Sequence, residues 1–121
     1  MYLLTPDQVN YFHILVVAPL LLYLAANRQN TPTFVIYGLG LAVLGGVLYH
    51  AMRLYQRIDY EGLSLSYPNL VNLFHLLIVF PILYCVFSMD GKMSSRRATM
   101  IQTVAVGVLL YHAYRLYQRT L

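Results

Sequence analysis

The chain alternates long apolar stretches with short polar segments. Apolar residues fill residues 8–26, 33–56, 70–88 and 98–118, and the few charged residues lie near the ends of these stretches. Each stretch has about 19 to 24 residues, which as an α-helix is enough to cross about 30 Å of hydrocarbon. Because the stretches are continuously apolar and do not alternate with a period of two, they are not barrel strands. The pattern predicts an all-α fold, a four-helix transmembrane bundle.

Polar residues mark where these helices begin and where they are joined. Thr5 to Gln8 reads as a capping box with a proline at the first helical position, and Pro68 repeats the proline before the third stretch. Short connectors at 27–32, 57–68 and 90–97 join the four helices. No basic segment precedes the first stretch, so we expect a retained helix and not a cleaved signal peptide. We expect one integral membrane domain over 1–121.

The composition supports membrane residence. Hydrophobic residues make up 60% of the chain and charged residues 10%, against about 25% charged residues in ordinary soluble domains. The lipid bilayer is therefore the expected partner. The net charge of +4 does not indicate a nucleic-acid surface, because the basic residues flank the apolar stretches and suit lipid headgroups.

The chain contains an internal repeat. Residues 9–57 align without a gap with residues 71–119, with 58–68 as the linker, and 18 of the 49 aligned positions are identical. The identities fall at 9–21 and 45–57, whereas 22–44 match nothing in the second copy. They include Pro19 and Pro81, which remove a helical hydrogen bond and are expected to loosen the first helix of each copy just below its histidine. They also include Gly45 and Gly107, which either let helices approach closely or leave room for a bound group. Each copy is a predicted helical hairpin with two crossings, so the bundle consists of two tandem hairpin repeats and both copies enter the membrane from one side. This predicts a pseudo-twofold axis along the membrane normal.

Both termini are expected on the same side of the membrane. The basic residues divide evenly between the two sides and leave the orientation open. The side of the termini has Arg53, Arg57, Arg115 and Arg119, and the other side has Arg28, Lys92, Arg96 and Arg97.

All four histidines lie in the retained parts of the repeat. His13 is about seven residues into the first helix, and His50 is about seven residues before the end of the second. At 1.5 Å per residue, both lie roughly 10 Å below the same membrane surface, and His75 and His112 follow by the repeat. Asn10, His13, Val17 and Leu21 are predicted to share one helix face. We therefore expect one layer of four imidazoles, the histidine layer.

The first hypothesis for this layer is binding of haem b or a transition metal ion, with a redox or electron-transfer role. Imidazole is the commonest metal ligand, and facing helices often hold cofactors in a bundle core. His50 with His112, or His13 with His75, could supply two axial ligands, and all four histidines could hold a metal. Arg53 and Arg115 suit haem propionates. Tyr49 and Tyr111 lie beside the second histidine of each copy.

The second hypothesis is a proton or small-ion channel or transporter, in which the histidine layer is a relay or gate. The remote half of the bundle offers few polar residues, so a continuous path would need a homo-oligomer. A third hypothesis is a small membrane scaffold protein whose layer only clamps the helices. A hydrolase is not expected, because all four acids lie in predicted loops and no serine or cysteine neighbours a histidine. Cys85 is the single cysteine and has no partner for an internal disulfide.

The half-repeat around Phe12-His13 and Pro19, followed by Tyr49-His50 and Arg53, resembles short uncharacterised membrane proteins of large DNA viruses that infect algae. The resemblance covers most of the chain and implies a viral membrane origin. It implies no activity and no functional residues.

Overall fold

The computed structural model describes residues 3–121, and this part of the chain is helical with no strand. The structure therefore confirms an all-helical protein. In chain order the elements are α1 (Pro6–Phe12), the π turn η1 (His13–Val17), α2 (Ala18–Asn27), the 3-10 turn η2 (Arg28–Asn30), α3 (Thr33–Glu61), α4 (Tyr67–Phe74), the π turn η3 (His75–Val79), α5 (Phe80–Ser88) and α6 (Ser95–Thr120).

Among the described residues, three helical segments are long and apolar enough to span a membrane, as expected of a membrane protein. They are Pro6–Asn30, Thr33–Glu61 and Tyr67–Ser88. The 26-residue α6 is long enough but is not among them. Polar residues such as Gln102 interrupt its middle, and arginines lie near both of its ends. Four crossings, termini on one side and a pseudo-twofold axis stay predictions.

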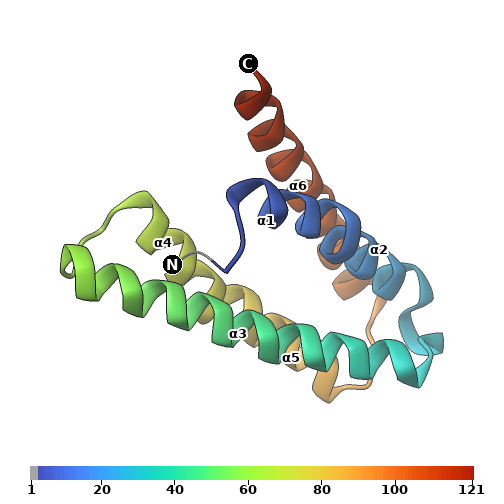
Figure 1. The fold of residues 1–121 in the computed structure, drawn as a ribbon. Coiled ribbons are helices and arrows are strands. Elements are labelled where there is room, and N and C mark those ends of the chain that lie inside the picture. Colours follow the sequence, from blue (N-terminus) through green and yellow to red (C-terminus); the bar gives the residue numbers. More distant parts are fainter. Residues whose placement is uncertain (1–2) are drawn as a thin grey trace. The chain divides into compact units, whose positions relative to one another are not determined.

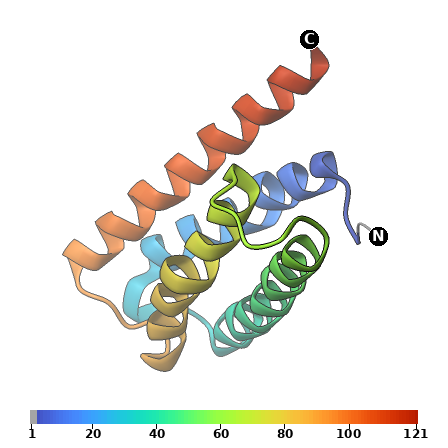
Figure 2. The same ribbon diagram turned by 90° about the vertical axis from the view of Figure 1, so that its left-hand side faces the viewer.

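The helices associate in two compact units. Unit 1 combines the described residues up to Asn30 with Lys92–Leu121, so that α6 packs along α1, η1 and α2. Unit 2 is Thr31–Gly91, in which α3 packs along α4, η3 and α5 (Figures 1 and 2). Each unit therefore pairs the first helix of one sequence copy with the second helix of the other copy. A single membrane domain over 1–121 stays a prediction.

Small residues bring the helices of unit 1 together. Ala18 and Ala25 of the first helix and Ala98 and Ala105 of α6 are all buried. In each helix the two alanines are seven residues apart, which places them two turns apart on one face. Small residues let helix backbones approach closely in a membrane, where no hydrophobic effect drives helices together.

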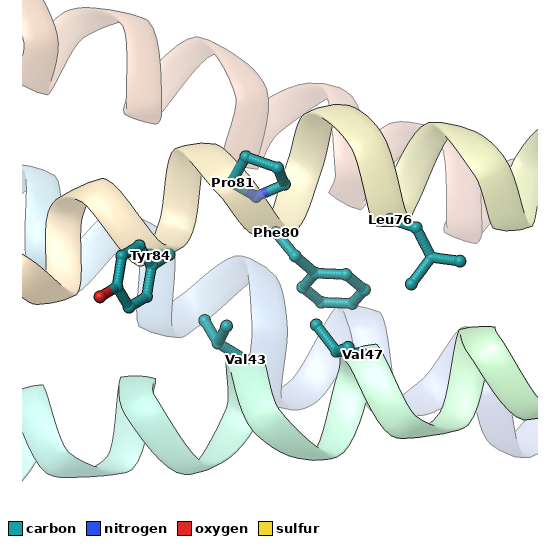
Figure 3. A pocket seen from close by; sticks show the side chains of 6 residues that line it. All are labelled: Val43, Val47, Leu76, Phe80, Pro81 and Tyr84. Atoms are coloured by element: carbon teal, nitrogen blue, oxygen red, sulfur yellow. The ribbon is translucent and has the colours of Figure 1, made fainter.

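Aromatic side chains and glycines bring the helices of unit 2 together. Figure 3 shows the Phe80 ring directed from α5 toward α3, where Val43 and Val47 lie. A Cβ atom added to Gly46 would meet this ring at 2.4 Å, and one added to Gly40 would meet Phe87 at 2.7 Å. The two glycines therefore leave the room that the rings fill. Beside Phe80, an open apolar groove of about 350 Å³ runs between α3 and α5.

A π turn widens the first helix of each copy at its histidine. The Ala18 N–H donates to the His13 carbonyl, five residues back, and the Phe80 N–H donates to the His75 carbonyl. Each π turn directly precedes a proline at N1 or N2 of the next helix segment, and proline has no N–H to continue the α-helical pattern. The expected loosening at these prolines is confirmed.

The wide turns change which residues reach the core. The face predicted for a straight helix placed Val17 beside Asn10 and His13, but Val17 is half-buried and Ala18 is 1% exposed. A turn that closes over five residues brings residue i+5 above residue i, so the buried face continues one residue later than predicted. Leu21 is buried, as expected.

The predicted helix start is confirmed in detail. Thr5 Oγ1 accepts a hydrogen bond from the Gln8 N–H at 3.2 Å, and Gln8 Oε1 accepts one from the Thr5 N–H at 2.9 Å. This reciprocal capping box satisfies two backbone donors at the start of α1.

Candidate functional site: two stacked histidine pairs

Each unit brings two of the four predicted histidines into contact. In unit 1, the His13 and His112 rings stack with centres 4.0 Å apart and planes 16° apart. In unit 2, the His50 and His75 rings stack with centres 4.2 Å apart and planes 10° apart. In each pair, one histidine lies in a π turn and the other lies within the long helix that packs against that turn. The structure thus pairs His13 with His112 and His50 with His75. The pairs named from the sequence, His50 with His112 and His13 with His75, and the histidine layer of all four stay predictions.

The Nδ1 atom of every histidine faces an oxygen. His13 Nδ1 lies 2.7 Å from the Val9 carbonyl, and His75 Nδ1 lies 2.8 Å from the Val71 carbonyl. Both contacts span four residues of the histidine's own helix. A carbonyl oxygen can only accept, so each of these Nδ1 atoms carries the proton.

The other two histidines are held across the helix pair by asparagines. His112 Nδ1 and Asn10 Oδ1 are 2.8 Å apart in unit 1, and His50 Nδ1 and Asn72 Oδ1 are 2.8 Å apart in unit 2. Both asparagines are buried. With the amide oxygen toward the ring, Nδ1 again donates, so the neutral form of all four rings has its lone pair on Nε2.

Asn10 and Asn72 belong to the site, although the sequence hypothesis assigned them no role beyond a shared helix face. The signal was present in the repeat. Both copies carry asparagine three residues before the first histidine, which is the spacing that places two side chains on one helix face. Their function in the structure is to orient the second histidine of the other copy.

Aromatic residues surround the pairs unequally. Tyr49 meets His50 edge to face at 5.3 Å between ring centres, and Tyr111 meets His112 in the same way at 5.0 Å. In unit 2, the Phe80 ring centre also lies 5.6 Å from that of His50. The position equivalent to Phe80 in unit 1 is Ala18, which has no ring. His50 is accordingly 8% exposed, whereas His112 is half-buried.

The predicted arginines lie one turn beyond the second histidines. Arg53 donates to Gln56 Oε1 at 3.2 Å and is half-buried, and Arg115 is exposed. One further turn along each helix, another arginine links the two helices of the unit. Arg57 donates to Asn69 Oδ1 at 3.0 Å in unit 2, and Arg119 forms an ion pair with Asp7 in unit 1.

The retained glycines Gly45 and Gly107 do not mediate helix contact within either unit. A Cβ atom at either position would find no atom within 4 Å. Of the two explanations that the sequence allowed, the packing inside the units does not support close helix approach, and room for a bound group stays a prediction.

Among the described residues, no three histidine, cysteine, aspartate or glutamate side chains are grouped so that they could hold a metal ion. The site therefore consists of paired imidazoles with outer partners. The chain matches no family model, no curated protein and no solved structure.

Proposed function

We propose that the histidine pairs bind haem b or a transition metal ion through Nε2, and that the bound group serves electron transfer. The observation that carries this proposal is the common orientation of the four rings, each with Nδ1 donating to an oxygen. A histidine that binds a metal almost always donates its other N–H to a carbonyl or carboxylate, which holds the ring in place and makes Nε2 more basic.

The stacking limits how a metal can be bound. Two imidazoles on one ion, each about 2 Å from it, have ring centres about 5 to 6 Å apart and nitrogens that converge. The rings of each pair are instead nearly parallel at 4.0 and 4.2 Å. One ring of each pair is therefore the ligand, and its neighbour supports it by stacking.

The asparagine-held rings are the better ligands. His50 and His112 donate their Nδ1 hydrogen bond to an asparagine on the opposite helix, so both helices of the pair fix the ring. His13 and His75 bond only to their own backbone. When bound, haem would supply one-electron redox chemistry, and the chain's residues would hold the ring, exclude water and place arginines toward the propionates.

The test is an absorption spectrum and an elemental analysis of the full chain, purified after expression with added haem and metals. We expect a Soret band or a stoichiometric metal, lost in the His50→Ala/His112→Ala double variant. Tyr37→Ala and Gln102→Ala serve as controls and should keep it. A purified folded protein with neither signal, or equal losses in both sets of variants, would contradict the proposal.

The second candidate, a proton or small-ion pathway, is favoured by one observation. Each pair brings two titratable rings to within 4.0 or 4.2 Å of one another, so a charge on one ring opposes a charge on the other. Such a pair suits a relay. Liposomes containing the wild-type chain would then show pH-dependent currents that His13→Ala and His75→Ala also abolish, without any haem or metal present.

A further inference from the structure

Charge divides unevenly between the two units. Unit 1 has six basic residues and one acid, whereas unit 2 has two basic residues and three acids. The single acid of unit 1 is Asp7, and it pairs with Arg119. The sequence of unit 1 therefore contains no further acidic side chain.

Four of these basic residues lie at one end of unit 1, which we call the basic end: Arg28, Lys92, Arg96 and Arg97. Arg28 directly follows α2, and its Nε donates to the Met93 carbonyl at 3.4 Å. This bond ties the end of α2 to the segment that leads into α6. Lys92, Arg96 and Arg97 are exposed.

The position of the two exposed arginines is electrostatically unfavourable. Arg96 and Arg97 lie in the first turn of α6, which contains no acid. The unpaired N–H groups of a helix start make it the positive end of the helix dipole, where cations are disfavoured and anions are favoured. Ser94 caps only the Arg97 N–H, at 3.2 Å. An anion from outside the chain would offset this concentration of positive charge.

The basic end also adjoins a helix that is apolar enough to span a membrane. Arg28 lies within the candidate span Pro6–Asn30. One turn before the end of α2, Tyr23 is 42% exposed, as is typical of tyrosines at the level of lipid headgroups. The charges are therefore located where the hydrocarbon of a membrane would give way to phosphate groups.

The equivalent end of unit 2 lacks this charge. The positions 62 residues before Arg96 and Arg97 hold Phe34 and Val35, and the position 62 residues after Arg28 holds Asp90. Only unit 1 therefore carries this positive charge at its helix ends. A general preference of membrane helix ends for basic residues does not explain the charge, because unit 2 lacks it.

We propose that the basic end of unit 1 binds the headgroups of anionic lipids at the membrane surface. Arginine side chains bind phosphate through paired N–H donors, and each basic residue near an anionic surface strengthens the attraction by about fivefold. This inference does not depend on the histidine pairs or on any cofactor.

The test uses the full chain in phosphatidylcholine vesicles that contain spin-labelled phosphatidylglycerol or spin-labelled phosphatidylcholine. Electron paramagnetic resonance measures the fraction of each label that is immobilised by the protein. We expect the wild type to prefer phosphatidylglycerol. Arg96→Gln/Arg97→Gln should reduce the preference by about 25-fold, at roughly fivefold for each of the two charges. The matched Arg96→Lys/Arg97→Lys variant should keep most of it.

Two further measurements keep the proposal falsifiable if the glutamine variant does not fold. Rising salt should weaken the wild-type preference, because these charges are exposed and ions screen them. A preference that salt leaves unchanged, or that the folded glutamine variant retains, overturns the proposal. Displacement of the lipid by inorganic phosphate at constant ionic strength would assign the site to a soluble phosphate and equally overturn it.

Discussion

Units 1 and 2 hold their histidine pairs with the same hydrogen bonds but fill the neighbouring space by opposite means. Unit 2 places the large Phe80 against Gly46. At the equivalent positions, unit 1 has the small Ala18 and the larger Val108. A gain in volume on one helix is thus matched by a loss on the other, which keeps the total volume of the contact similar.

The same exchange occurs about two turns further from the histidines. Phe87 fits against Gly40 in unit 2, and the equivalent positions in unit 1 are Ala25 and Gln102. The side chains at these positions therefore differ between the units, whereas the imidazoles, their asparagines and the tyrosines beside them are identical. The comparison teaches that the histidines and their partners were retained while residues that pack beside them changed.

The largest effect should come from breaking the packing of unit 2. Gly46→Val introduces a side chain where even a Cβ would lie 2.4 Å from the Phe80 ring. Overpacking of this kind costs about 1–3 kcal/mol in the free energy of unfolding. Titration of the detergent-solubilised protein with sodium dodecyl sulfate, followed by circular dichroism, would measure the loss.

Two variants sharpen this prediction. Gly45→Val is the matched control, because no atom lies within 4 Å of its Cβ position, and it should stay within about 0.5 kcal/mol of the wild type. The double variant Gly46→Val/Phe80→Ala gives unit 2 the residue types that unit 1 has at Val108 and Ala18. It should lose less free energy of unfolding than the sum of the losses in the two single variants. If the losses of the two single variants are additive in the double variant, the residues of unit 1 cannot replace the contact between Gly46 and Phe80.

A smaller loss is expected from the asparagines. Asn72→Leu removes the acceptor of His50 Nδ1 and leaves a buried donor unsatisfied, at a cost of about 1–2 kcal/mol. Asn10→Leu should cost less, because its partner His112 is half-buried and can turn to other acceptors. Nitrogen-15 spectra of the imidazoles would report the Nδ1 proton in each case. Asn72→Asp keeps the acceptor, and a loss of the Nδ1 proton in that variant would contradict this account.

The smallest effect concerns the clamps at the ends of the units. Asp7→Asn converts the ion pair with Arg119 into an arginine–amide hydrogen bond of the kind that Arg57 and Asn69 form in unit 2. Exposed ion pairs contribute only about 0.2–1 kcal/mol, so the change in stability should be small and should vanish at high salt. The reverse change, Asn69→Asp, should cost more, because Asn69 is 1% exposed and its Nδ2 donates to the Ser64 carbonyl. If Asp7→Asn and Asn69→Asp change the free energy of unfolding equally, the two arginine contacts do not differ in this way.

Much of the fold could be predicted from the sequence because it depends on local patterns. Apolar length predicted the helices, Thr5 and Gln8 predicted the first cap, and Pro19 and Pro81 predicted a loosened backbone. The choice of partner helix could not be predicted. Both copies present nearly the same faces, so the apolar pattern does not distinguish a helix that packs within its own copy from one that packs against the other.

The site was predictable in its residue types but not in its pairing. The repeat singled out the four histidines, but depth alone could not predict which of them stack on one another. The face of the first helix was predicted one residue early because periodicity assumes 3.6 residues per turn, and the turn at His13 is wider. The contribution of Asn10 and Asn72 depends on a contact between distant segments, which no local pattern reports.

The extra residue in each π turn also separates two parts of a helix mechanically. On one side of it lie the asparagine and the histidine, and on the other side lies the apolar segment that packs with small or aromatic residues. A straight helix would force both segments to rotate together, so any repacking of the apolar half would swing the imidazole away from its neighbour. The wide turn lets the two segments rotate independently, so the apolar segment of the first helix in each copy can change without moving the histidine.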